Sequence, residues 1–166
     1  DMIRNIAHDR GVKVVDVPKI CLIQATRNKP HQGVVAVADP LSVQFSESLP
    51  ARTAKNDADL PRVWIAFDEV KLPMNTGALI RSAYFFNGGV IAGSQAGSLS
   101  YVSADAAKAA CGALDILAAK NRLFRPQDDN LAAFVTKSRK NGWNVIGTGF
   151  GDKAMALSDA TKTYPA

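Results

Sequence analysis

The chain has 166 residues, of which 47% are hydrophobic, so it can bury the core of one ordinary domain or form parts of two. Its net charge of +5 and isoelectric point near 9.4 suit an anionic partner such as RNA, although many soluble proteins are equally basic. It has no apolar run of about 18 residues and no basic-then-apolar leader, so we expect neither a membrane protein nor a secreted one.

The two cysteines, Cys21 and Cys111, lie far apart without a C-x-x-C motif, and the only histidines are His8 and His31. This pattern argues against a zinc site and against a disulfide framework. We therefore expect no metal site, and reduced thiols in an intracellular compartment.

The first forty residues carry two helical and two extended patterns. Helices are predicted over residues 2–10 and 19–24. Alternating apolar residues predict a half-buried strand over residues 12–17, and an apolar run predicts a second strand over residues 34–38.

A polar and basic loop, residues 26–30, leads to His31. Basic loops supply the sequence-independent part of RNA affinity, so Arg27 and Lys29 are candidate contacts to RNA phosphates; the alternative is that both are solvated. An isolated histidine before a glycine turn is more often structural. We therefore do not expect His31 to be catalytic and keep it only as a candidate RNA contact.

The polar stretch of residues 42–60 contains Pro50 and lacks periodicity, which is typical of an interdomain linker. The continuous apolar run of residues 63–67 then predicts a strand buried on both faces. A domain boundary is accordingly expected near residue 60.

A loop and a helix follow this strand. Pro73 disfavours helical geometry at Leu72, and Asn75 is well placed to cap a helix that starts at Thr76. The apolar face expected to meet the sheet consists of Leu79, Ile80, Ala83 and Phe86.

Arg81 lies off that apolar face. Helical side chains lean toward the N-terminus, so Arg81 can reach back over the turn that holds Asn75 and Gly77, beside unpaired backbone amides. This arrangement predicts a phosphate-sized electropositive pocket. The alternative is that Asn75 merely caps the helix and Arg81 is solvated.

Further strands and helices alternate along the rest of the chain. A strand is predicted over residues 89–92, a helix is expected from its cap Ser103 to Leu117, another helix covers residues 128–141, and a strand follows over residues 143–148. This alternation predicts an α/β fold with a parallel sheet and helices on both faces.

A glycine cluster follows the last predicted strand. Gly147, Gly149 and Gly151 suggest a dinucleotide-binding loop, but a G-x-G-x-x-G pattern would need glycine at Asp152. An unrelated α/β oxidoreductase is therefore disfavoured.

Three segments of the sequence resemble segments of a known protein family. The pattern D-x-V-x-x-P-x-N-x-G-A-x-x-R-S-A over residues 68–83 resembles the first motif of the SpoU/TrmH RNA ribose 2′-O-methyltransferases of the SPOUT superfamily, except that Leu72 replaces a usual acidic residue. Residues 28–41 are similar to the end of the small ribosomal-protein-like domain that precedes the catalytic domain in many members. Residues 108–114 resemble the K-x-(S/A)-x-G-A segment, in which we expect Gly112 to permit helix contact.

The resemblance implies S-adenosylmethionine-dependent 2′-O-methylation of a ribose in RNA, closest to mitochondrial large-subunit rRNA members. Asn75 and Arg81 match the motif residues implicated in catalysis. Arginine is a poor base because its pKa exceeds about 12, so we favour Arg81 as a clamp on the target phosphate. The alternative is a catalytically inactive SpoU-like RNA-binding or ribosome-assembly factor.

The family also implies an organisation for the chain. Residues 1–41 would end a small α/β RNA-recognition domain, and residues 61–166 would begin a methyltransferase domain that is knotted when complete. The family's later G-x-E and S-L-N-V-S motifs are absent, so the chain reads as a fragment whose cofactor-binding residues lie beyond Ala166. Expected partners are rRNA, a large-subunit assembly intermediate, and a second copy or a paralogue, in mitochondria or otherwise in the cytoplasm.

Overall fold

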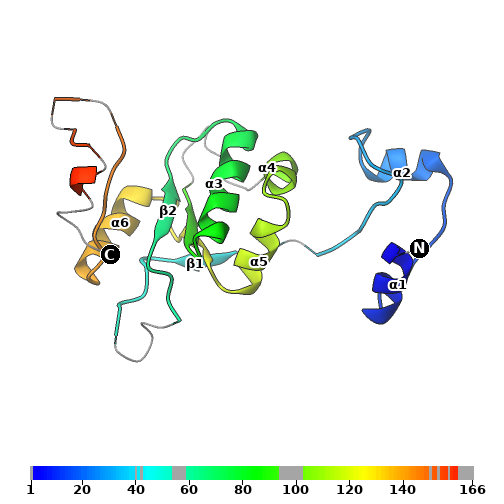
Figure 1. Ribbon diagram of the computed structural model, residues 1–166, viewed down its shortest axis with the longest axis horizontal. Coiled ribbons are helices and arrows are strands. Elements are labelled where there is room, and N and C mark those ends of the chain that lie inside the picture. Colours follow the sequence, from blue (N-terminus) through cyan, green and yellow to red (C-terminus); the bar gives the residue numbers. More distant parts are fainter. Residues whose placement is uncertain are drawn as a thin grey trace. The chain divides into compact units, whose positions relative to one another are not determined.

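The computed structural model divides the chain into two compact units, Asp1–Pro40 and Leu41–Ala166 (Figure 1). The residues that it describes are 2–39, 41, 43–53, 59–93, 103–149, 151–152, 154–156 and 158–160.

The first unit contains two helices, α1 (Met2–Asp9) and α2 (Lys19–Ala25), which confirms both helical predictions. The two predicted strands, residues 12–17 and 34–38, are wrong, because neither segment is a strand in the structure. A half-buried strand needs a partner strand and a covered apolar face. No described residue of this unit is buried, and Val37 is 95% exposed.

The second unit is built on a four-stranded sheet in the order β1-β4-β3-β2, with every neighbouring pair parallel. This confirms the predicted parallel sheet. Its strands are β1 (Gln44–Ser46), β2 (Trp64–Phe67), β3 (Gly89–Ala92) and β4 (Leu123–Pro126). Its helices are α3 (Pro73–Phe85), α4 (Ala104–Ala109), α5 (Ala113–Ala119) and α6 (Leu131–Lys140).

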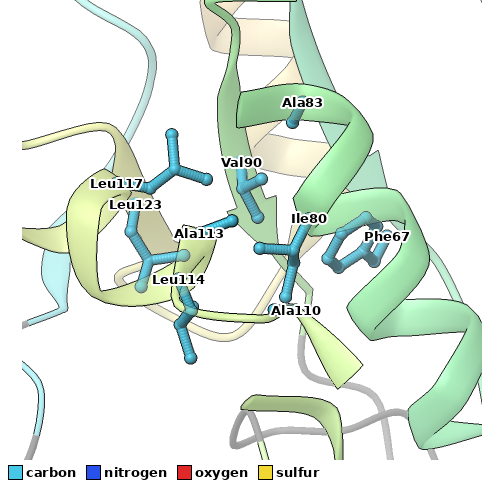
Figure 2. Packing of buried hydrophobic residues seen from close by; sticks show 9 residues of the cluster. All are labelled: Phe67, Ile80, Ala83, Val90, Ala110, Ala113, Leu114, Leu117 and Leu123. Carbon is cyan, nitrogen blue, oxygen red and sulfur yellow. The ribbon is translucent and has the colours of Figure 1, made fainter. Parts of the chain in front are cut away.

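Two apolar clusters cover the two faces of the sheet. In β3, Val90 belongs to the first cluster and Ile91 to the second, because neighbouring side chains of a strand point to opposite faces. The first cluster, drawn in Figure 2, joins α3 and α5 to the sheet. The second contains Phe134 of α6, which lies on the other side of the sheet from α3 (Figure 1). Helices therefore lie on both faces, as predicted.

The strand expected to be buried on both faces is β2, but β2 lies at an edge of the sheet. Trp64 and Ile65 are half-buried and Ala66 is exposed. The fully buried strand is β3, which pairs on both sides. The apolar run alone could not distinguish an edge strand from a central one.

The single helix expected after Ser103 is two helices, α4 and α5, separated by a turn. The Ser103 hydroxyl does cap α4, because it accepts a hydrogen bond from the Ala106 N–H. Cys111 and Gly112 then have φ of 52° and 83°, which breaks the helix. A Cβ at Gly112 would meet no atom within 4 Å, so this glycine supplies a backbone conformation and not the helix contact we expected.

The strand predicted over residues 143–148 is absent from the described structure, whereas β4 was not predicted. Trp143 is instead a buried member of the second cluster, and its indole N–H donates to the Pro50 carbonyl at 2.9 Å. The preceding helix is confirmed as α6. Its N-cap Asn130 accepts from Ala133 N–H, and Gly142 takes a positive φ just after its end.

The stretch of residues 42–60 is not a structureless linker over its whole length. It contributes β1, which pairs with β4, and its Leu49 is only 4% exposed. The Leu49 N–H donates to Ser138 Oγ at 2.9 Å, and Asn141 Nδ2 donates to the Leu49 carbonyl at 2.8 Å. These contacts hold Leu49 against α6 and the residue that follows it.

Ser138→Ala is expected to destabilise the second unit by about 1–3 kcal/mol, because it leaves the buried Leu49 N–H without an acceptor. Ser138 is 2% exposed, so water cannot replace its hydroxyl. The matched control is Thr136→Ala, since Thr136 lies on the same helix and is exposed, and among the described residues its hydroxyl only donates to the Ala132 carbonyl. Urea unfolding of the two variants compares them. Equal small losses would show that residue 49 is not held by α6.

Candidate functional site

The motif of residues 68–83 begins at the carboxyl end of β2 and continues into α3. Phe67, the last residue of β2, pairs in register with Ala92, the last residue of β3. Ligands of open parallel sheets bind outside the carboxyl ends of the strands, in the loops that follow them. The motif therefore occupies the position in the fold where binding residues gather.

The helix begins earlier than predicted. α3 starts at Pro73, with the extended residue Leu72 as its N-cap and no side-chain cap. Proline is favoured at the first helical position because its N–H would have no partner there anyway. Asn75 is therefore not the cap but an exposed residue in the first turn, so its amide side chain is available for another use.

The helix start exposes fewer free amides than expected. Pro73 has no N–H, and the N–H groups of Asn75 and Thr76 donate to the Leu72 carbonyl at 3.0 and 3.1 Å. An anion near this turn would depend mainly on the helix dipole and on nearby cations, not on a row of unpaired amides.

One buried face of α3 sets the position of the motif. Thr76, Gly77, Ile80 and Ala83 are buried. Phe86, which we expected on this face, is 74% exposed and lies beyond the helix end, where Asn87 takes a left-handed conformation. Leu79 packs partly buried against the first cluster.

Gly77 lies where α3 and α4 approach each other closely. A Cβ on Gly77 would lie 2.4 Å from Ala109 Cβ and 2.7 Å from the Ala106 carbonyl oxygen. Only glycine fits this approach. Gly77 is therefore a packing residue and not part of an open anion loop, and the contact brings the end of α4 beside the turn of α3 that precedes Arg81.

Arg81 is exposed, as expected for a residue off the apolar face. Its Nη1 lies 3.8 Å from Cys111 Sγ, in the turn between α4 and α5. No hydrogen bond joins the described side chains of Asn75 and Arg81, which lie on different turns of α3. Cys111 is a neighbour of Arg81 that the sequence analysis did not identify. The one sequence feature that could have indicated it is the adjacent Gly112, because a glycine inside an alanine-rich stretch can end a helix.

The candidate RNA contacts of the first unit lie just after α2. Arg27 is exposed and takes a left-handed backbone conformation, φ 52°, at the end of that helix. Lys29 is also exposed, whereas His31 is half-buried. His31 Nδ1 accepts a hydrogen bond from the Gly33 N–H at 3.2 Å, which is the structural use expected of it.

A buried polar side chain without a partner would mark a place for part of S-adenosylmethionine. Among the described residues, the one buried side-chain nitrogen without a partner is Trp64 Nε1, which lies among the aromatic rings of the second cluster, near Phe124 and Trp143. None of these residues is therefore assigned to the cofactor. The described part of the chain also contains no group of His, Cys, Asp and Glu that could hold a metal ion, and none of its helices is long and apolar enough to cross a membrane.

Comparison with known proteins gives relatives named as RNA methyltransferases. The chain is 27% identical over 164 residues to "rRNA methyltransferase 1, mitochondrial" of Dictyostelium discoideum, an alignment covering 85% of this chain and 29% of that protein. It is 33% identical over 159 residues to an uncharacterized tRNA/rRNA methyltransferase of Mycobacterium leprae, covering 96% of this chain and 48% of that protein.

A third relative, an uncharacterized tRNA/rRNA methyltransferase of Mycolicibacterium vanbaalenii, is 35% identical over 83 residues, half of this chain and 26% of that protein. No protein-family model and no solved structure matches the chain. The chain thus spans less than half the length of these relatives. Their names support the prediction of an RNA methyltransferase.

Proposed function

We propose that the protein carrying this chain transfers a methyl group from S-adenosylmethionine to a ribose 2′-hydroxyl of RNA. The RNA that we favour as substrate is a large-subunit rRNA. The observation that carries the proposal is the placement of the motif of residues 68–83 at the carboxyl edge of a parallel sheet, with Asn75 and Arg81 both exposed on α3. The names of the relatives support the same reaction class.

In this methyl transfer, the main role proposed for Asn75 and Arg81 is to orient the RNA. A ribose hydroxyl is a weak nucleophile, so a site must hold it in line with the methyl carbon and help to remove its proton. The planar guanidinium of Arg81 can donate two parallel hydrogen bonds to a phosphate next to the target ribose. The Asn75 amide can donate to or accept from a sugar or phosphate oxygen.

The exposed cations Arg27 and Lys29 would add sequence-independent affinity for the RNA backbone, with His31 at the end of the same loop. A homodimer or a pair with a paralogue is part of the proposal, as is binding to an assembly intermediate of the large subunit. Mitochondrial localisation is proposed from the name of the Dictyostelium relative.

The test is methyl transfer from radiolabelled S-adenosylmethionine to an unmodified large-subunit rRNA transcript by the full-length protein. We expect label in the RNA that depends on both the protein and the transcript. Tight binding of the transcript without any transfer would favour the inactive RNA-binding or ribosome-assembly factor instead. Label in the base of a nucleotide would contradict the ribose assignment.

A further inference from the structure

Arg81 is held from one side by a turn that is itself fixed in the core. Ala110 is fully buried before this turn and Ala113 is 3% exposed after it, and both belong to the same cluster as Ile80, the residue next to Arg81 (Figure 2). The close contact of Gly77 with Ala109 fixes α4 on α3 as well. This packing fixes the turn relative to the backbone of α3 at Arg81.

The backbone conformation of the turn places the Cys111 side chain beside Arg81. Cys111 and Gly112 take left-handed conformations in succession, φ 52° and 83°. Cys111 directly follows Ala110, the C-cap of α4, and helices commonly end with a left-handed residue at this position. The result is an exposed side chain next to Arg81.

The hydrogen bonds of Cys111 have a consistent direction. The thiol donates to the Ala109 carbonyl, with a distance of 3.6 Å from sulfur to oxygen. The thiol proton is used in that hydrogen bond, so toward Arg81 the sulfur acts as the acceptor. Arg81 Nη1 donates to Cys111 Sγ, with 3.8 Å between nitrogen and sulfur. The guanidinium has five N–H donors, so one can bind the sulfur while the others remain free for an anion.

We propose that Cys111 is a positioning residue for Arg81: its sulfur accepts one guanidinium N–H and holds the planar fork in the orientation that receives the RNA phosphate. This inference rests on the proposed function, because it gives Arg81 the role of phosphate clamp. It concerns how the clamp is oriented and assigns Cys111 no contact with RNA. An arginine on an exposed helix otherwise loses considerable side-chain entropy when it binds, and a prearranged fork loses less.

The experiment is a double-mutant cycle on the methyl-transfer rate of the full-length protein, with the variants Cys111→Ala, Arg81→Ala and their combination. We expect Cys111→Ala to lower kcat about tenfold, with the KM for S-adenosylmethionine unchanged. In the Arg81→Ala background the same substitution is expected to have no further effect, because there is no guanidinium left to position.

Two further variants separate positioning from a structural role. Cys111→Ser keeps a group that donates to Ala109 and accepts from Arg81, so it should recover most of the lost rate. Cys21→Ala removes the other exposed cysteine and should leave the rate unchanged. Thermal melting checks that every variant is folded.

The inference is overturned if Cys111→Ala keeps the wild-type rate, or if it lowers the rate by the same factor with and without Arg81. Loss of activity in Cys111→Ser equal to that in Cys111→Ala would also contradict it. If Arg81→Ala is itself fully active, the clamp fails and this inference fails with it. A large but measurable loss in Arg81→Ala, about a hundredfold, with no coupling to Cys111 would leave the proposed function standing and remove only the positioning role.

Discussion

Arg81→Ala in the full-length protein is expected to lower the rate of methyl transfer to RNA about a hundredfold, while folding and affinity for S-adenosylmethionine stay nearly intact. Arg81 is exposed on α3, and among the described residues its side chain hydrogen-bonds only to Cys111 Sγ, so its removal creates no cavity and leaves no buried group of these residues unpaired. Loss of a charged hydrogen-bond donor at the reacting group costs roughly 3 kcal/mol or more, about a hundredfold in rate. Single-turnover methylation kinetics measure this loss.

Arg81→Lys tests whether the planar guanidinium group matters in addition to the positive charge. Lysine keeps the positive charge but cannot make two parallel hydrogen bonds to a phosphate, so it should restore little of the rate. The control is Arg62→Ala, an exposed arginine that precedes β2, whose removal should change stability by less than about 0.5 kcal/mol and the rate hardly at all. Near wild-type methylation by Arg81→Ala would remove both the role and the choice of site.

Gly77→Ala should destabilise the second unit by about 1–3 kcal/mol, because the new Cβ would lie 2.4 Å from Ala109 Cβ and 2.7 Å from the Ala106 carbonyl. These are backbone and short side-chain atoms that cannot turn away, so α3 and α4 must move apart. The movement would also shift the turn that carries Cys111, and methyl transfer should fall together with stability. Urea unfolding and the methylation rate measure the two effects.

The matched control for this variant is Ser82→Ala. Ser82 is on the exposed side of the same helix, and within the described part of the chain its hydroxyl only donates to the Ala78 carbonyl, at 3.0 Å. Its replacement should change the free energy of unfolding by no more than about 0.5 kcal/mol. If Gly77→Ala were as stable as this control, α3 and α4 would not be packed as closely as the structure has them.

Elements with a strong local pattern could be predicted from the sequence. The apolar run ending at Phe67 gives β2, the run ending at Ala92 gives β3, and the helical spacing of Phe134 and its neighbours gives α6. Caps were readable where a single residue decided them, as at Ser103. The parallel arrangement followed from the alternation of strands and helices.

The elements that were missed lack such a pattern. β1 has three residues and β4 ends in Pro126, and both form because tertiary pairing in the sheet overrides weak local preference. The stretch after Trp143 looks like a strand from its apolar residues, but it has no partner strand among the described residues. The start of α3 was misplaced because the preference for proline at the first helical position outweighed the capping preference of Asn75.

Only those features of the candidate site that depend on neighbouring residues in the sequence could be predicted. The motif identified Asn75 and Arg81, and helical periodicity placed Arg81 off the buried face. The direction of the guanidinium depends on where α4 packs, and that is decided by the absence of a Cβ at Gly77 and by the turn at Cys111. No local sequence signal contains that tertiary information.

Methylation of the ribose 2′-oxygen is tested most directly by mass spectrometry of nucleosides from an rRNA transcript that the full-length protein has methylated. The proposal predicts a single 2′-O-methylnucleoside, which the wild type forms and which Arg81→Ala forms about a hundredfold more slowly. A methylated base in its place, or no methylated nucleoside with wild-type protein that binds the transcript, would contradict it.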